Sequence, residues 1–156
     1  MKKSRGFTLL ELIIVLGLAV VVMTGVFAHL RTNNRRNIQN ASLAIQADLR
    51  YAQRRAMTEG IRYFVHFEPS QNRYHIMRYP NRLVRTAYVQ NGVNLFNNNF
   101  TNNRLIFLPR GTASMGGTII LNNPPYWQHI TATVSGGRIR VFEPTRTNQQ
   151  GVGEID

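Results

Sequence analysis

The feature that most constrains this chain is a long apolar run near its amino terminus, residues 7–30. As a helix, these 24 residues reach about 36 Å, enough to cross the hydrocarbon core of a bilayer, which is about 30 Å thick. Lys2, Lys3 and Arg5 precede the run, and basic flanks stay on the cytoplasmic side. The sequence therefore predicts a single-pass helix in the cytoplasmic (inner) membrane, with a cytoplasmic amino terminus and the remaining chain outside.

One carboxylate interrupts the apolar run, at Glu11. A charged side chain inside a membrane helix costs about 2.5–3.5 kcal/mol even on the lenient insertion scale. A segment that only had to span a membrane or be secreted would be better without this acid. We therefore expect Glu11 to have a function, and we expect it to need a cationic partner that relieves its desolvation.

The residues around Glu11 resemble the type III signal of type IV pilins and pseudopilins. The match is a basic leader followed by Gly6-Phe7-Thr8-Leu9-Leu10-Glu11-Leu12. The resemblance implies that a prepilin peptidase/methyltransferase cuts between Gly6 and Phe7 and methylates the new amine of Phe7. It also implies that Glu11 faces the amino-terminal amine of a neighbouring subunit when an inner-membrane platform assembles the filament.

Two other interpretations of the amino terminus stay open. The first is an ordinary secretory signal peptide with a small-residue cleavage site at Val26-Phe27-Ala28, and the second is an uncleaved anchor. Secretory signals have apolar cores of about 7–15 residues, shorter than this run, and Glu11 lies inside it. Both features favour the prepilin interpretation.

Residues 31–60 are predicted to continue the same helix outside the membrane, since residues 26–59 contain neither Pro nor Gly. Apolar residues recur there at steps of three and four, which is typical of a helix with one buried stripe. The stripe consists of Ile38, Ala41, Ile45, Leu49, Ala52 and Ala56. Gly60 fits the position that caps a helix carboxyl end.

After Gly60 the hydrophobic period changes to two, which predicts antiparallel strands over residues 61–142. Seven asparagines fall among the thirteen residues 91–103, which we expect to form a loop, and residues 143–156 should form a loose tail. A long helix followed by antiparallel strands is an α+β fold with the helix packed on the sheet. The predicted parts are a leader (1–6), a transmembrane helix (7–30), the soluble half of the helix (31–60), a β head (61–142) and the tail (143–156).

The head resembles the GspH/FimT-type minor pseudopilins at four places. These are residues 49–60, the strand end Phe107-Leu108-Pro109-Arg110-Gly111, the strand 117–121, and Gly137-Arg138-Ile139-Arg140. The resemblance implies a pilin-like fold and a minor subunit of a type IV pilus or type II secretion pseudopilus. Its partners would be other pilin or pseudopilin subunits, in a surface or periplasmic filament. The chain alone does not distinguish secretion, pilus and competence systems.

The sequence gives no reason to expect an enzyme, a metal site or a cofactor. Cysteine is absent, so thiolate chemistry is excluded. The four histidines lack metal-ligand spacing. His66 and His75 face each other if their strands form a hairpin, and the other interpretation, which we expect, is that they are exposed strand histidines. No two carboxylates form a convincing acid/base pair.

Charge is the second informative property. Without the leader the chain has 16 basic residues against 7 acidic ones, and every basic residue is arginine. Arginine suits bidentate phosphate contacts and stacking on bases. The alternative is a genome whose base composition favours arginine codons, and the composition does not separate the two.

The most specific functional hypothesis concerns Arg138 and Arg140. Alternate residues of a strand share a face, so these side chains lie about 7 Å apart, a spacing that suits neighbouring phosphates. The motif resembles the Gly-Arg-x-Arg through which some FimT-like minor pilins bind DNA in natural transformation. DNA is therefore a candidate partner, and the alternative is a solvated strand face. Further candidates are Arg110, Arg146, Arg104 and the pair Tyr126-Trp127, which could stack a base or fold onto the core.

Overall fold

The computed structural model describes the backbone of residues 9–146 and the side chains of residues 9–23 and 33–146. The chain divides into two compact units, Met1–Asn33 and Asn34–Asp156, and we call the second unit the head. The predicted leader and the predicted cleavage site between Gly6 and Phe7 lie outside the described residues.

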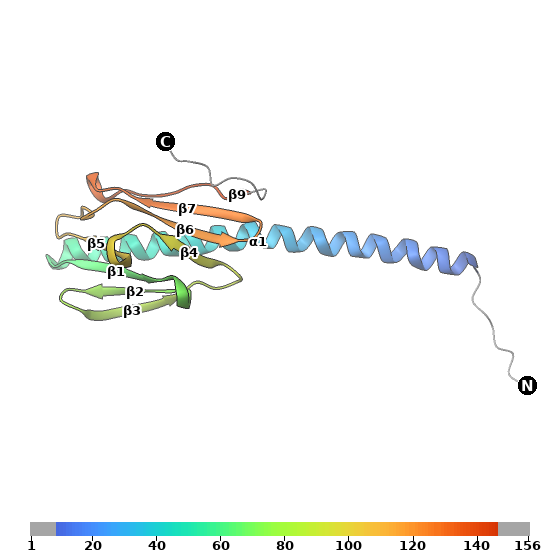
Figure 1. Ribbon diagram of the computed structural model, residues 1–156, viewed down its shortest axis with the longest axis horizontal. Coiled ribbons are helices and arrows are strands. Elements are labelled where there is room, and N and C mark those ends of the chain that lie inside the picture. Colours follow the sequence, from blue (N-terminus) through green and yellow to red (C-terminus); the bar gives the residue numbers. More distant parts are fainter. Residues whose placement is uncertain (1–8, 147–156) are drawn as a thin grey trace, which may run out of the picture. The chain divides into compact units, whose positions relative to one another are not determined.

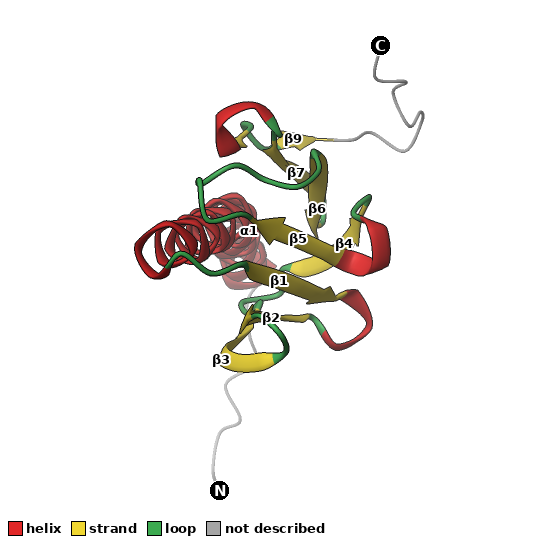
Figure 2. Ribbon diagram, turned by 90° about the vertical axis from the view of Figure 1, so that its left-hand side faces the viewer, coloured by secondary structure: helices red, strands yellow, loops and turns green. Residues whose placement is uncertain are grey.

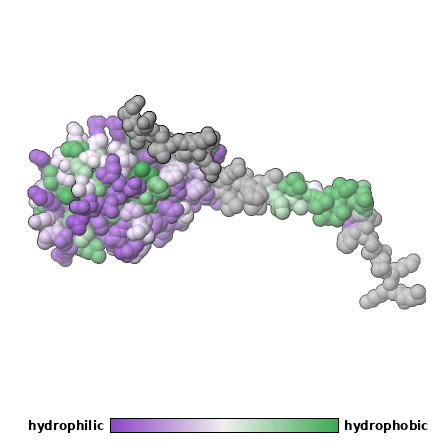
Figure 3. All heavy atoms as spheres, in the orientation of Figure 1, coloured by the Kyte–Doolittle hydropathy of each residue, from purple (hydrophilic) through white to green (hydrophobic). Residues whose placement is uncertain are grey.

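A single helix, α1 (Leu9–Glu59), supplies the described part of the first unit and the start of the head (Figure 1). The prediction of one continuous helix is confirmed. Glu11 lies in its first turn. The large apolar side chains from Leu9 to Met23 are exposed, and they form the hydrophobic surface of the first unit in Figure 3. Within the described residues, no helix combines the length and apolar character needed to cross a membrane.

The apolar stripe of α1 is the centre of the head. Every predicted stripe residue is buried except Ala41, which is partly buried and packs against the same core. The helix ends at Glu59, and Gly60 follows with a φ of +65°, the left-handed conformation expected of a glycine cap. The sequence periodicity therefore predicted both the buried side and the end of this helix.

Two antiparallel sheets pack against the stripe (Figure 2). The first has the order β3-β2-β1-β5 and the second the order β4-β6-β7-β8, with β9 paired to β7. The strands of the first sheet are β1 (Tyr63–Glu68), β2 (Arg73–Arg78), β3 (Arg82–Tyr88) and β5 (Arg104–Phe107). Those of the second are β4 (Asn94–Asn98), β6 (Gly117–Asn123), β7 (Tyr126–Ala132), β8 (Ile139–Val141) and β9 (Thr145–Arg146). Three 3₁₀ turns complete the described elements: η1 (Pro69–Gln71), η2 (Thr101–Asn103) and η3 (Ser135–Gly137).

The asparagine-rich segment 91–103 is not the loop that its composition predicted. It contains β4 and η2, and β4 pairs with β6 through a register shift between Leu95 and Asn97. Leu95 and Phe100 are buried in the core and anchor the segment. The Asn99 side chain accepts a hydrogen bond from the backbone N–H of Thr118 (2.6 Å), so an asparagine here extends the sheet pairing.

The segment 143–156 was predicted to be a loose tail, but its first residues are part of the second sheet. Its first residues form β9, in which Thr145 pairs with Trp127 and Arg146 with Tyr126. This pairing was missed because a two-residue strand carries no periodicity. Residues 147–156 lie outside the described part of the chain.

Asn72 joins the two sheets. It adopts a φ of +50° after the β1–η1 turn, in the left-handed region that asparagine tolerates. Its side-chain amide donates to the carbonyls of Val89 and Val93 (both 2.8 Å), and its Oδ1 accepts from the N–H of Leu95 (2.6 Å). One side chain therefore fixes the segment that leaves the first sheet at β3 and enters the second at β4.

A buried polar group ties the helix to the first sheet. Asp48 accepts hydrogen bonds from the hydroxyl of Tyr74 (2.7 Å) and from Arg85 (2.9 Å). Burial, followed by the hydrogen bond to Asp48, raises the pKa of Tyr74 above its ordinary value. Both partners of this carboxylate lie in the sheet, so the contact fixes how α1 sits on β2 and β3.

Candidate functional site at the arginine hairpin

The candidate site is the hairpin of β7 and β8, which turns through η3. Gly136 and Gly137 both have positive φ, at +72° and +58°, and the N–H of Thr133 donates to the carbonyl of Arg138 (2.9 Å). Two successive glycines are typical of a tight hairpin turn, and the backbone makes such a turn at this point.

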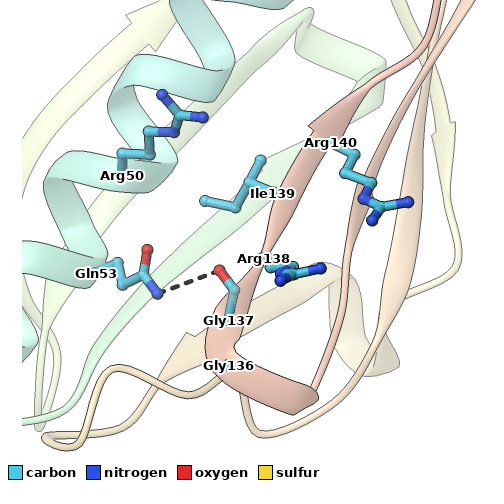
Figure 4. Close-up of a pocket in the computed structure, with 7 residues that line it drawn as sticks. All are labelled: Arg50, Gln53, Gly136, Gly137, Arg138, Ile139 and Arg140. Atoms are coloured by element: carbon cyan, nitrogen blue, oxygen red, sulfur yellow. Dashed lines mark hydrogen bonds between the residues drawn. The ribbon is translucent and has the colours of Figure 1, made fainter.

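Two glutamines of α1 hold the hairpin against the helix. Gln53 donates from Nε2 to the carbonyls of Gly111 (2.6 Å) and Gly137 (3.1 Å), and Figure 4 shows the bond to Gly137. Gln46 donates to the carbonyl of Ile139 (3.1 Å). A Cβ at Gly137 would collide with the Gly111 carbonyl oxygen and with the Gln53 amide. The absence of a side chain at Gly137 therefore allows this close approach.

A shallow groove of about 380 Å³ lies between α1 and the hairpin. Figure 4 shows Ile139 pointing toward the helix, while Arg138 and Arg140 point away from it. The alternation expected of a strand is thus observed, since Ile139 is buried and both arginines are exposed. The groove is lined by Arg50, Gln53, Gly136, Gly137, Arg138, Ile139 and Arg140.

The charge of this site is uncompensated. Residues 34–146 contain fifteen arginines and four acids, and each of the four acids is paired elsewhere. The pairs are Asp48 with Arg85 (2.9 Å), Glu59 with Arg55 (2.6 Å) and Arg78 (3.0 Å), Glu68 with Arg73 (2.7 Å), and Glu143 with Arg35 (3.8 Å). Ten of the fifteen arginines have no ion pair with an acid of the described residues, and Arg50, Arg138 and Arg140 are the three of them that gather at this groove. The hairpin is therefore an anion-attracting surface.

Of the other predicted arginines, one lies beside this site and one lies in the other sheet. Arg110 is exposed and donates to the hydroxyl of Thr112 (3.1 Å), and it directly precedes Gly111, whose carbonyl meets Gln53 beside the hairpin. Arg110 thus belongs to the same end of the head. Arg104 lies in the other sheet, with its guanidinium 5.1 Å from the ring centre of Phe64.

Arg146 is separated from the hairpin because β9 pairs with the start of β7, whereas β8 pairs with its end. Arg146 donates to the Tyr126 hydroxyl from Nε (3.1 Å) and Nη2 (2.8 Å), and its guanidinium lies 5.2 Å from that ring centre. Tyr126 is buried, so of the predicted pair it is the residue folded onto the core, and Trp127 is the partly exposed one.

Arg50 is a site residue that the sequence prediction missed. It lies on α1, about ninety residues before the hairpin, and only the fold brings it to the groove. A signal existed: Gln46, Arg50 and Gln53 form a polar row beside the apolar stripe at helical spacing. Such a row predicts a contact at the edge of the core without identifying the contacting strand.

His66 and His75 face each other across the β1–β2 hairpin. The sequence allowed this arrangement but favoured exposed strand histidines. His75 Nδ1 is 2.8 Å from the Thr86 hydroxyl, and its Nε2 is 3.3 Å from Glu68. In the part of the chain that the structure describes, no group of three or more potential ligands could hold a metal ion.

Comparison with known families gives two matches. The sequence model of the type II transport protein GspH matches residues 41–144, and that of the prokaryotic N-terminal methylation motif matches residues 1–27. No curated protein matches the sequence.

Solved structures with a similar fold come from two bacteria. The minor pseudopilin EpsH of the Vibrio cholerae type 2 secretion system aligns with a TM-score of 0.56 and 13% identity, covering 67% of this chain and 95% of that chain. The type IV minor pilin FimU of Pseudomonas aeruginosa aligns with a TM-score of 0.54 and 15% identity, covering 67% and 91%. At such low identity these likenesses show the fold alone.

Proposed function

The chain belongs to the GspH family of type II transport proteins, and we propose that it is a minor subunit of a type II secretion pseudopilus or type IV pilus. The observation that carries the proposal is the combination of this head with a prokaryotic N-terminal methylation motif. The role is structural, not catalytic. The subunit would be anchored in the cytoplasmic membrane, with its head outside, and would then enter a periplasmic or surface filament.

Assembly would depend on processing at the amino terminus. We infer that prepilin peptidase cleaves between Gly6 and Phe7 and methylates the amine of Phe7. Glu11, in the first turn of α1, would then meet the amine of a neighbouring subunit inside the filament. In an apolar medium each charge offsets the desolvation of the other, so the pair favours a defined axial position of one subunit on the next.

Glu11→Ala is expected to be processed normally but to enter filaments poorly, because the amine of its neighbour loses its counter-charge. Mass spectrometry of the membrane fraction checks cleavage, and immunoblots of sheared filaments check incorporation. Leu12→Ala is the matched control and should assemble. Gly6→Glu should retain the leader mass. Wild-type incorporation of Glu11→Ala, or cleavage of Gly6→Glu, would contradict the proposal.

A second function, DNA capture by the head, is favoured by one specific observation. Arg138, Arg140 and Arg50 lie at the hairpin and on the adjoining turn of α1, where no acid pairs with them, while the acids of the head pair with other arginines. Guanidinium groups bind phosphates through paired hydrogen bonds. The two functions are compatible, because the helix would assemble the filament and the head would bind its ligand.

Arg138→Ala/Arg140→Ala is expected to weaken DNA binding by the full chain and to flatten its salt dependence. Each phosphate contact contributes a slope of about −0.9 in log affinity against log salt for duplex DNA. The double variant should therefore lower the magnitude of the slope by nearly 2. Arg36→Ala/Arg82→Ala removes equal charge from exposed positions elsewhere. Equal losses in the two variants would show that only total charge matters.

A further inference from the structure

The outer face of the second sheet has properties that the filament role does not explain. We use this name for the face opposite α1. Along β7 the residues Gln128, Ile130 and Ala132 are buried, so Trp127, His129 and Thr131 alternate onto the outer face. Thr131 pairs with Arg140 of β8, which places this arginine on the same face.

One end of the outer face carries two aromatic rings. Phe96 is the extra residue at the register shift of β4, and its side chain is 57% exposed. Its ring reaches across β6 to Trp127 on β7, with centres 4.9 Å apart and planes at 84°. Trp127 is itself partly exposed. A bulge thus moves an aromatic ring out of the core and sets it edge-on against a second ring at the surface.

The other end of the outer face is basic. Arg140 lies opposite Thr131, and Arg138 lies opposite Thr133, whose N–H donates to its carbonyl. At about 3.3 Å per residue, Thr131 is about 13 Å and Thr133 about 20 Å from Trp127. Phe142 is 52% exposed between the two ends, and its N–H donates to the carbonyl of His129 (3.0 Å).

On the first sheet, by contrast, several basic side chains have an acidic or an aromatic partner. There Glu68 binds Arg73 (2.7 Å) and lies beside His75 (3.3 Å), and Arg104 covers the ring of Phe64. The outer face of the second sheet holds no acid among its described residues. Glu143, which follows Phe142 in the sequence, pairs with Arg35 of α1.

We propose that the outer face binds single-stranded DNA, with bases stacking at Trp127 and Phe96 and phosphates at Arg140 and Arg138. This proposal rests on the DNA-binding function proposed for the hairpin and names its substrate class. A duplex keeps the faces of its bases stacked inside and presents its backbone and the base edges in its grooves, so it offers no base face to the aromatic end. A single strand offers both groups at once, and a track of about 20 Å accommodates a few nucleotides.

Trp127 is the only tryptophan of the chain, so its fluorescence reports directly on this face. The full chain in detergent is titrated with oligothymidylate of about 15 nucleotides and with a duplex of equal length. The single strand should quench Trp127 and should bind more tightly than the duplex. By anisotropy of the labelled single strand, Phe96→Ala and Trp127→Ala should each lose about tenfold in affinity.

The controls separate stacking from folding and from charge. Tyr79→Ala removes an equally exposed aromatic ring (58%) outside the outer face and should bind as wild type. Trp127→Phe keeps a ring and should retain most of the affinity. Phe96→Ala alters a mainly exposed side chain, so it tests the proposal even if Trp127→Ala unfolds.

Three outcomes would overturn the proposal. Duplex binding that depends on Arg138 and Arg140, without quenching and without an effect of Phe96→Ala, leaves the hairpin function standing and removes the stacking face. Binding of neither DNA form removes the hairpin function as well. A change of Trp127 emission with protein concentration alone would assign the outer face to contacts between copies of the chain.

Discussion

Replacing Asn72 by alanine is expected to destabilise the head by about 3–5 kcal/mol, a large part of the stability of an ordinary domain. Alanine removes three side-chain hydrogen bonds, to the carbonyls of Val89 and Val93 and from the N–H of Leu95. Unpaired buried backbone groups cost about 1–3 kcal/mol each. Alanine at a φ of +50° adds about 1 kcal/mol of backbone strain. Thermal unfolding followed by circular dichroism gives the change.

Two variants of Asn72 separate these contributions. Asn72→Gly keeps the left-handed backbone free of strain and loses only the side-chain bonds, so it should be about 1 kcal/mol more stable than Asn72→Ala. Asn72→Asp keeps the acceptor for Leu95 and loses both donated bonds, so it should fall between wild type and alanine. A loss of less than about 0.5 kcal/mol for Asn72→Ala would show that the junction of the sheets does not depend on this residue.

Gly137→Ala is expected to cost about 3 kcal/mol and to displace the arginine hairpin from α1. The φ of +58° strains alanine by about 1 kcal/mol, and its Cβ would also overlap the carbonyl oxygen of Gly111 and the amide of Gln53. The Gly111 oxygen belongs to the backbone and cannot rotate away. The hairpin would therefore have to move, and DNA affinity should fall with stability although both arginines remain.

Gly136→Ala is the matched control for this prediction. Its φ of +72° carries the same backbone strain, but a Cβ there meets nothing within 4 Å. It should lose only about 1 kcal/mol and keep the affinity of the wild type for DNA. Chemical denaturation of both variants, together with the salt titration, measures the difference. Equal losses at the two glycines would show that strain alone, and not the contact with Gly111 and Gln53, determines the cost.

The helix was predictable because its signals are local. A stripe with steps of three and four, and a glycine after it, need no knowledge of the rest of the chain, and both are confirmed. The division of the strands into two sheets was not predicted, because pairing depends on partners far apart in sequence. For example, β1 pairs with β5, which begins some forty residues later in the sequence, after β2, β3 and β4.

The candidate site was only partly predictable for the same reason. The shared face of Arg138 and Arg140 follows from strand alternation alone. The contribution of Arg50, the separation of Arg146 and the contact of Phe96 with Trp127 follow from packing. Composition misled at residues 91–103, where the side chains of Asn97, Asn98 and Asn99 accept hydrogen bonds from backbone N–H groups instead of marking a loop.

The position of the helix stripe at the beginning of the chain has a consequence for synthesis on the ribosome. The stripe is complete at Ala56, but β8, which contributes Ile139 to the same core, follows about 80 residues later. At about 5–20 residues per second, roughly 4–16 s pass between synthesis of the stripe and synthesis of the last strand that contributes a buried residue to its core. During that interval the row of Ile and Leu side chains is incompletely covered, because the strands of the second sheet have not all been made. A chaperone that holds it, or a delay in the release of the chain, would therefore decide how much of this protein folds and how much aggregates.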